Sequence, residues 1–136
     1  MSKTILIFVN KKYIPFYRLR LFDIKQSSNI VNVRAHPTEI LSLDWSKYDD
    51  HLLVTGSCDN RLHLWDIRMI NSAVNSFEGH QAAIRRVKFD PYRRDYLASA
   101  GYDGYLKLWN LTSRENKVRN LIKRNNNNCL TPGYQT

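Results

Sequence analysis

The chain has 136 residues, 43% of them hydrophobic, which suits one domain of ordinary size with a packed core and excludes a chain disordered throughout. Its two cysteines, Cys58 and Cys129, lie far apart and outside any C-x-x-C pair, so we expect a reducing compartment and neither a metal site nor a disulfide framework. The net charge of +9 raises the question of nucleic-acid binding, but the basic residues lie mainly in the flanks of the chain, and we expect no nucleic-acid partner.

Residues 1–16 form a leader whose apolar run covers only residues 5–9. This run is shorter than the core of a secretory signal and far shorter than a membrane span. Because no other stretch is long enough to cross a bilayer, we predict a soluble, cytoplasmic protein without membrane insertion. The leader matches no part of the repeat that follows, and we expect it to supply no strand to that repeat.

An internal repeat begins after the leader. His80 follows His36 by 44 residues, and three blocks of similar residues recur at this step. The blocks are 36–45 over 80–89, 52–59 over 96–103 and 62–66 over 106–110. A partial third copy lies upstream at residues 19–23. Three aligned blocks at one offset predict two copies of one structural unit.

Each copy is expected to fold into four short antiparallel strands. In the first full copy, residues 40–45 and 52–55 are short apolar runs, and residues 61–65 alternate polar with apolar, which is typical of a strand with one buried face. Residues 73–77 supply an outer strand, and in the second copy residues 117–122 favour one more. Asp59-Asn60 and Asp103-Gly104 are typical of tight hairpin turns.

A histidine, a hydroxyl, an aspartate and a tryptophan recur at the same places in both copies. They are His36, Thr55, Asp59 and Trp65 in the first copy and His80, Ser99, Asp103 and Trp109 in the second. A hydroxyl, a histidine and an aspartate also suggest a hydrolase triad. However, a catalytic set is needed once, whereas a repeated set is what each structural unit needs for itself. We therefore expect a structural network, no catalytic residues and no enzyme.

The repeat length, the Gly79-His80 start and the Trp65-Asp66 end resemble the WD-repeat family over residues 17–110. The resemblance implies an all-β fold, a partial WD40 β-propeller with two complete four-stranded blades plus part of a third, which is not closed. It also implies that in each blade the Trp donates to the hydroxyl, the hydroxyl bonds the His and the His bonds the turn Asp. No cofactor and no metal are implied.

The pattern predicts a division of the chain into five segments. They are a leader (1–16), a partial repeat (17–34), two repeats (35–78 and 79–122) and a low-complexity tail (123–136). Phe22 replaces the first Trp, Ala35 the glycine before His, and Asn110 the last Asp of the pattern. Two copies are too few for a propeller of four to eight blades, so we expect a fragment or truncated product that self-associates or dissolves poorly.

Residues 35–48 and 83–91 are similar to a narrower family, the receptors for the type 2 peroxisomal targeting signal. This resemblance implies a cytosolic receptor that shuttles to the peroxisome. Its partners would be the basic, leucine-containing signal helices of peroxisomal matrix proteins and an import co-receptor. Such a helix needs an apolar groove edged with carboxylates, so Glu39 is the first candidate peptide-binding residue, with Pro37 and Tyr102 on the same rim.

The alternative is another WD-repeat interaction scaffold, such as a ubiquitin-ligase substrate adaptor. The segment 65–68 resembles the W-D-x-R ending by which some WD proteins dock a cullin-type ligase adaptor. The two hypotheses differ in their ligand, which is a basic signal helix in one and a ligase component in the other.

Overall fold

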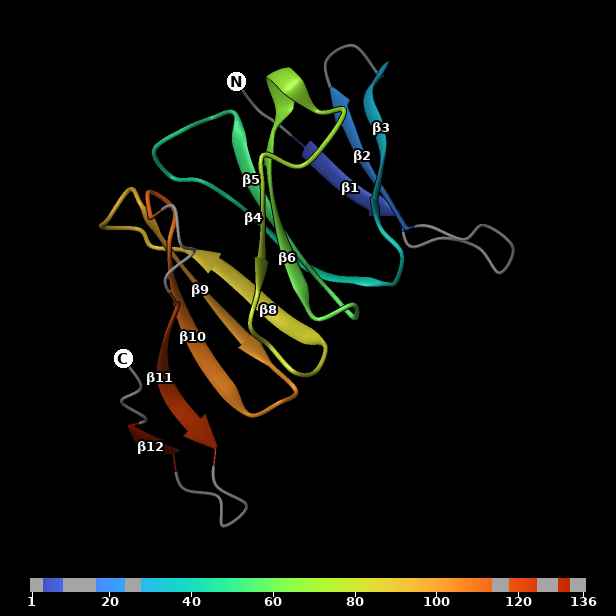
Figure 1. Ribbon diagram of the computed structural model, residues 1–136. Helices are drawn as coiled ribbons and strands as arrows, with labels where there is room; N and C mark the ends of the chain where they lie inside the picture. The colour runs from blue at the N-terminus through green and yellow to red at the C-terminus, as the bar shows by residue number, and fades with distance from the viewer. Residues whose placement is uncertain (1–3, 9–16, 24–27, 114–117, 125–129, 133–136) are drawn as a thin grey trace.

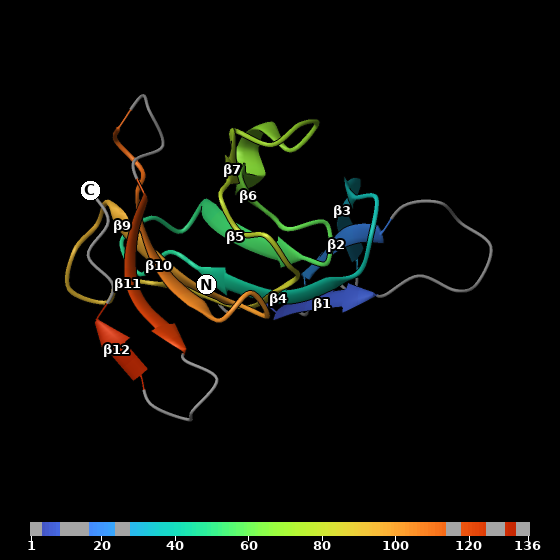
Figure 2. The same ribbon diagram turned by 60° about the horizontal axis from the view of Figure 1, so that its bottom comes forward.

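The computed structural model describes residues 4–8, 17–23, 28–113, 118–124 and 130–132, with side chains for residues 17–21 and 31–113. Apart from the 3-10 turn η1 (Ile67–Met69), the regular structure in these segments consists of strands, in three antiparallel sheets. Both views place the first sheet far from the last, with the second between them (Figures 1 and 2). The described sheets do not close into a ring, which confirms the predicted all-β, unclosed partial propeller.

The first sheet has the order β1-β2-β3, from the strands β1 (Thr4–Phe8), β2 (Tyr17–Asp23) and β3 (Ser28–His36). In β2, Leu19 and Leu21 are buried. The prediction that the leader supplies no strand to the first copy of the repeat is wrong, because β1 pairs along β2 from Thr4 to Phe8. The comparison of the repeats within the sequence did not reveal this strand, because strand pairing uses the backbone and does not require the side-chain pattern of the repeat.

The second sheet has the order β4-β5-β6-β7 and follows the predicted strands closely. Its strands are β4 (Ile40–Trp45), β5 (Leu52–Ser57), β6 (Arg61–Asp66) and β7 (Asn75–Glu78). The hairpin between β5 and β6 turns at Asn60, whose φ of 69° lies in the left-handed region that Asn tolerates better than most residues.

The third sheet repeats this order and adds a strand. Its strands are β8 (Ile84–Phe89), β9 (Tyr96–Gly101), β10 (Tyr105–Asn110), β11 (Val118–Arg124) and β12 (Leu130–Pro132). Gly104, with a φ of 81°, makes the turn between β9 and β10 where a side chain would be strained. β11 corresponds to the extra strand expected at residues 117–122. β12 lies in the predicted tail, and Cys129 falls outside the described residues.

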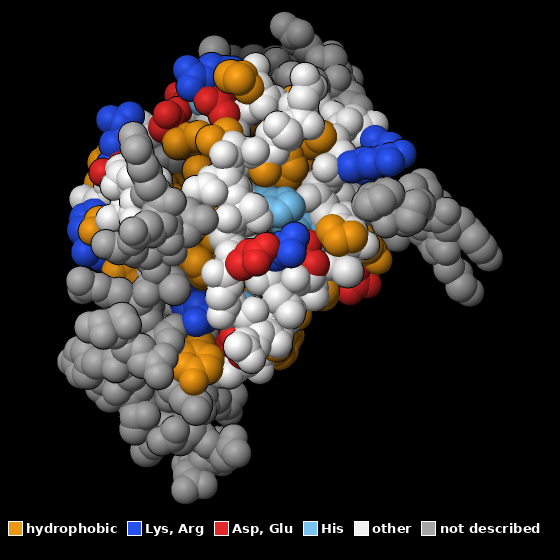
Figure 3. Space-filling model, viewed as in Figure 1, with side chains coloured by type: hydrophobic (Ala, Val, Ile, Leu, Met, Phe, Trp, Pro, Cys, Tyr) orange, Lys and Arg blue, Asp and Glu red, His pale blue; other side chains and the backbone are white. Residues whose placement is uncertain are grey.

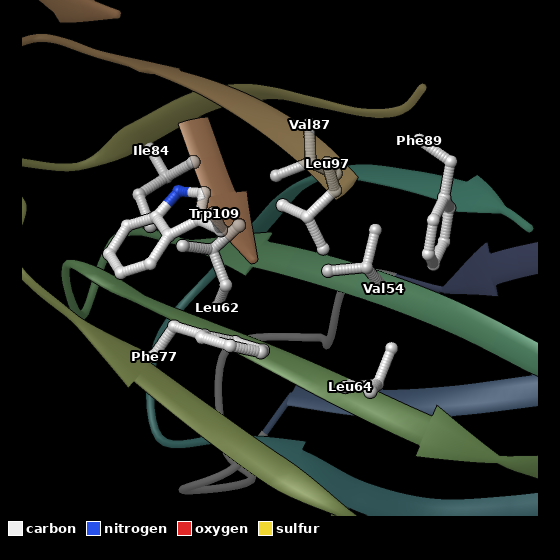
Figure 4. Packing of buried hydrophobic residues seen from close by; sticks show 9 residues of the cluster. All are labelled: Val54, Leu62, Leu64, Phe77, Ile84, Val87, Phe89, Leu97 and Trp109. Carbon is white, nitrogen blue, oxygen red and sulfur yellow. The ribbon is translucent and has the colours of Figure 1, made fainter. Parts of the chain in front are cut away.

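Two apolar clusters hold the three sheets together. One joins the first two sheets and includes Leu19, Leu53 and Trp65. The other fills the space between the second and third sheets, where β5, β6 and β7 meet β8, β9 and β10 (Figure 4). It consists of Val54, Leu62, Leu64, Phe77, Ile84, Val87, Phe89, Leu97 and Trp109. Burial of these side chains is the main term that orders one sheet against the next.

Polar side chains of β4 also bond the edge of β8. The Val87 N–H donates to Ser42 Oγ (3.1 Å), and the Phe89 N–H donates to Asp44 Oδ2 (2.9 Å). Edge strands leave backbone N–H groups unpaired unless something accepts from them. Ser42 and Asp44 therefore set the register between the two inner strands. No helix in the described segments is long and apolar enough to span a membrane.

Candidate functional site

Strands of neighbouring sheets bring the first set of recurring polar residues together. The Trp65 indole on β6 donates from Nε1 to Thr55 Oγ1 on β5 (3.0 Å). Thr55 Oγ1 lies 2.8 Å from Nε2 of His36, at the end of β3, and His36 Nδ1 lies 2.8 Å from Asp59 Oδ2, in the turn after β5. His36, Thr55 and Trp65 are buried. The chain of contacts thus joins the first sheet to the second.

The third sheet contains the same arrangement. Trp109 Nε1 on β10 donates to Ser99 Oγ on β9 (2.8 Å). Ser99 Oγ lies 2.7 Å from His80 Nε2, and His80 Nδ1 lies 2.8 Å from Asp103 Oδ2. Asp103 also accepts from the backbone N–H groups of Gln81 (3.0 Å) and Tyr105 (3.1 Å).

The direction of each hydrogen bond follows from the groups available. An indole N–H can only donate, so each hydroxyl oxygen accepts from its Trp and gives its own hydrogen to His Nε2. The proton of the neutral imidazole then sits on Nδ1, from which it is donated to the carboxylate. This assignment of the tautomer satisfies every polar atom of the chain from Trp to Asp.

The pKa values of the acidic ends agree with this assignment. Burial opposes the ionised form of Asp59, but the hydrogen bond from His36 and the backbone N–H of Arg61 outweigh it and lower the pKa of that carboxyl. Burial likewise opposes ionisation of Asp103, whereas the Gln81 and Tyr105 N–H groups and His80 lower its pKa. Burial lowers the pKa of His80 despite its carboxylate partner. The pair of His80 and Asp103 is therefore a neutral His beside an ionised Asp.

The two hydroxyl groups are badly placed for nucleophilic catalysis. Thr55 is fully buried and Ser99 is 1% exposed, so neither oxygen can reach a substrate. Each hydroxyl already accepts from its Trp indole and donates to its His within the network. The described residues also contain no group of three or more His, Cys, Asp or Glu side chains placed to hold a metal ion.

The three candidate peptide-binding residues are all exposed and come from two segments of the chain. Pro37 and Glu39 lie in the segment between β3 and β4. Glu39 Oε2 lies 3.9 Å from the Cys58 thiol sulfur. Tyr102, 65% exposed, belongs to the turn after β9, where the guanidinium of Arg85 lies 6.0 Å from its ring centre.

Tyr17 is a neighbour of Glu39 that the sequence comparison did not single out. Burial, then the Glu39 charge and a hydrogen bond to Glu39, raise the pKa of the Tyr17 phenol. Burial, then the Glu39 charge and a hydrogen bond to Glu39, also raise the pKa of the Cys58 thiol. Tyr17 lies at the start of β2, beside His36 of β3 in the register, so only the pairing of the first sheet brings it to this rim.

A hollow of about 320 Å³ lies between the inner strands of the second and third sheets. Leu41 and Ser42 of β4 line one side, and Arg85, Arg86 and Tyr102 line the other. Charged groups on the view in Figure 3 occur in separate groups, with apolar side chains between them.

The repeated sheets and their matching Trp–hydroxyl–His–Asp networks define a WD-repeat protein. The WD40 family, described as "WD domain, G-beta repeat", matches residues 27–66 and 71–110, and the chain belongs to this family.

Several proteins with different names are similar in sequence to this chain. The Peroxisomal targeting signal 2 receptor of Saccharomyces cerevisiae is 33% identical over 111 residues, 65% of this chain and 30% of that protein. WD repeat-containing protein srw1 of Schizosaccharomyces pombe is 36% identical over 64% of this chain and 16% of its own length. Cell division cycle 20.5, cofactor of APC complex, of Arabidopsis thaliana is 34% identical over 65% of this chain and 21% of its own length. The chain thus spans less than a third of each relative.

Proposed function

We propose that this chain is a peptide-binding receptor module for the type 2 peroxisomal targeting signal, which acts in the cytoplasm and shuttles to the peroxisome with an import co-receptor. The similarity to the yeast receptor for that signal supports the proposal. The observation that carries it is the position of Glu39, an exposed carboxylate on the rim beside Tyr17 and Cys58.

Glu39 is not part of the repeated framework. Its counterpart one repeat later is Ala83, so the blade itself does not need a carboxylate at this place. In the described part of the chain, no Lys or Arg forms an ion pair with Glu39, although five ion pairs of Lys or Arg with other carboxylates are present there. An exposed carboxylate without a cationic neighbour is available to an arginine from a ligand.

An apolar contact lies close to this carboxylate. Leu41, two residues further on in β4, is 41% exposed, which is a large fraction for a leucine on an inner strand. A signal helix that presents arginine and leucine on one face would place the guanidinium on Glu39 and the leucine against Leu41. Electrostatic complementarity would fix the orientation, and burial of the leucine would add affinity.

The test is fluorescence anisotropy of the 136-residue chain with a labelled type 2 targeting-signal peptide. We expect Glu39→Ala to weaken binding about tenfold, or about 1.4 kcal/mol, because the peptide arginine loses its partner. Asp95→Ala is the matched control, since it removes an exposed carboxylate from the loop between β8 and β9, at the end of β8 opposite to Ile84 and Tyr102. Equal affinities for Glu39→Ala and the parent would overturn the role of Glu39. Failure of the parent to bind would overturn the receptor function.

A second candidate function is a ubiquitin-ligase substrate adaptor, and one observation favours it. Arg68 Nη2 and Nε lie 2.7 and 3.0 Å from the Asp66 carboxylate, so the Asp and the Arg of the W-D-x-R segment form a bidentate pair. The hydrogen bonds from Arg68 lower the pKa of Asp66 to about 2. One similar protein is named as a cofactor of the APC complex.

The two candidates can be separated with one further variant. If the chain docks a cullin-type adaptor through this segment, Arg68→Ala abolishes capture of that adaptor in a pull-down, and Arg94→Ala, which removes another exposed arginine, does not. Signal-peptide binding by Arg68→Ala equal to that of the parent, with no adaptor captured by either, supports the receptor and excludes the adaptor.

A further inference from the structure

The hollow between β4 and β8 is positively charged, and no described acidic group neutralises it. Arg85 and Arg86 line it from β8, and both are exposed. Neither forms an ion pair with a described residue, whereas Lys88 on the same strand lies 3.7 Å from Asp44. Asp44 is already occupied, because it accepts from the Phe89 N–H and pairs with Lys47 at 3.1 Å.

The WD framework does not require this pair of arginines. The equivalent positions one repeat earlier are Leu41 and Ser42, and the second sheet forms the same four strands and the same network with them. Two cations that line one hollow also repel each other. They therefore mark a surface property of the third sheet, distinct from its folding requirements.

From these observations we propose that the hollow lined by Leu41, Ser42, Arg85, Arg86 and Tyr102 binds an acidic peptide segment of a protein partner. A carboxylate of the segment accepts hydrogen bonds from the two guanidinium groups, which are suited to planar, bidentate recognition. An adjacent apolar side chain packs between Leu41 and the exposed Tyr102 ring, both of which offer apolar surface at the edge of the hollow.

The size and composition of the site favour a peptide over a polynucleotide. A volume of about 320 Å³ holds a few side chains, and its walls include a leucine and a tyrosine beside the two cations. Nucleic-acid binding without sequence preference instead uses a groove with a continuous track of cations. On the face shown in Figure 3, basic side chains occur in separate groups with acidic and apolar ones between them.

This site adjoins the proposed signal site and shares Leu41 with it, but its charged groups, Arg85 and Arg86, are not those of the signal site. Arg85 and Arg86 would repel the basic side of a signal helix. The signal helix and the acidic segment therefore bind groups of opposite charge on neighbouring parts of one rim. The two ligands would use different charged groups of the chain and would compete for Leu41. The acidic segment is expected to bind in the absence of a signal peptide.

The experiment uses the whole 136-residue chain and a short fluorescein-labelled peptide of Asp and Glu that carries one Leu and one Phe. A peptide in which Asn and Gln replace the acids serves as the ligand control. We expect the acidic peptide to bind and Arg85→Ala and Arg86→Ala each to weaken it about tenfold. Arg94→Ala is the matched protein control, because it removes an exposed arginine from the β8–β9 loop, away from the hollow, and is expected to change affinity less than twofold.

Several results would overturn the proposal. Equal binding of the acidic and the amide peptide would show that charge plays no role. Equal losses of affinity in Arg85→Ala, Arg86→Ala and Arg94→Ala would show that the effect comes from the net charge of the chain and not from the hollow. Tighter binding of a labelled single-stranded DNA, lost in Arg85→Ala and Arg86→Ala, would assign the hollow to nucleic acid. The signal-peptide test compares Glu39→Ala with the parent on a basic peptide, whereas this one compares Arg85→Ala and Arg86→Ala with the parent on an acidic peptide. Failure of one test is therefore distinguishable from failure of the other. Thermal melts of each variant confirm that it folds, since both arginines are exposed.

Discussion

The second and third sheets contain the same polar network, but the residues around it differ. In the second sheet, the residue before the turn is Ser57, whose hydroxyl donates to the Glu39 carbonyl (2.7 Å). In the third sheet this place is taken by Gly101, and a Cβ there would lie 2.6 Å from His80 Nδ1 and 2.7 Å from Asp103 Oδ1. Two blades can therefore form the same hydrogen-bonded network although the space beside the backbone at this position differs between them.

A second contrast concerns the inner strands. β4 presents Ser42 and Asp44, whose oxygens accept from the β8 backbone. The same places on β8 hold Arg86 and Lys88, which can only donate. The second sheet therefore uses these positions to attach its neighbour, whereas the third sheet presents cations there. This difference is the structural basis for expecting binding at the third sheet to be electrostatic.

The largest effect is expected from Gly101→Ala. The added methyl group forces His80 away from Asp103, which breaks their hydrogen bond and overpacks a buried site. We expect a loss of about 3 kcal/mol in the free energy of unfolding, measured by denaturant titration. Ser57→Ala is the control at the equivalent place of the second sheet. It keeps a Cβ already accommodated there and should cost only about 1 kcal/mol for its hydrogen bond. Equal losses in the two variants would contradict the difference in clearance.

The next effect compares the two aspartates. Asp103 accepts from His80 and from two backbone N–H groups, whereas Asp59 accepts from His36 and from the Arg61 N–H (3.0 Å). We expect Asp103→Ala to lower stability by about 2 kcal/mol and Asp59→Ala by somewhat less, because fewer donors lose their partner. Thermal melts of the two variants beside the parent measure this. A melting temperature of Asp103→Ala equal to that of the parent would rule out a stabilising network in the third sheet.

Sequence periodicity predicts much of this architecture, because a strand with one buried face alternates its side chains and a repeat shows the alternation twice. The strands from β4 to β11 follow from it. β1 and β12 do not, since a strand that joins a sheet through its backbone carries no obligatory pattern. The repeat in the sequence also does not predict the contacts between sheets. The approach of Tyr17 to Glu39, the bonds from Ser42 and Asp44 to β8, and the hollow at Arg85 depend on the packing of one sheet on another, which a linear spacing does not encode.

The smallest expected effect is on the pH dependence of stability, and it depends on a histidine of the second sheet that has no counterpart in the third. His63 stacks on His36 with ring centres 4.1 Å apart and bonds the Ala35 carbonyl (3.0 Å), whereas Lys107 takes its place in the third sheet. Burial, followed by the charge of His36, lowers the pKa of His63, and burial lowers that of His80. A base with a lowered folded-state pKa takes up fewer protons than the unfolded chain. Its stabilising contribution is therefore present above the unfolded value of about 6.5 and is lost as pH falls below it.

We accordingly expect the free energy of unfolding to fall between about pH 7.5 and about pH 5.5, a window above the range in which Asp59 and Asp103 take up protons. His63→Gln should make this dependence shallower, because it removes the titrating ring from the second sheet and leaves His80 in the third. Denaturant titrations of both proteins at the two pH values measure the difference. A slope unchanged by His63→Gln would assign the acid sensitivity to the third sheet, and a parent equally stable at both pH values would contradict the burial of neutral histidines in either sheet.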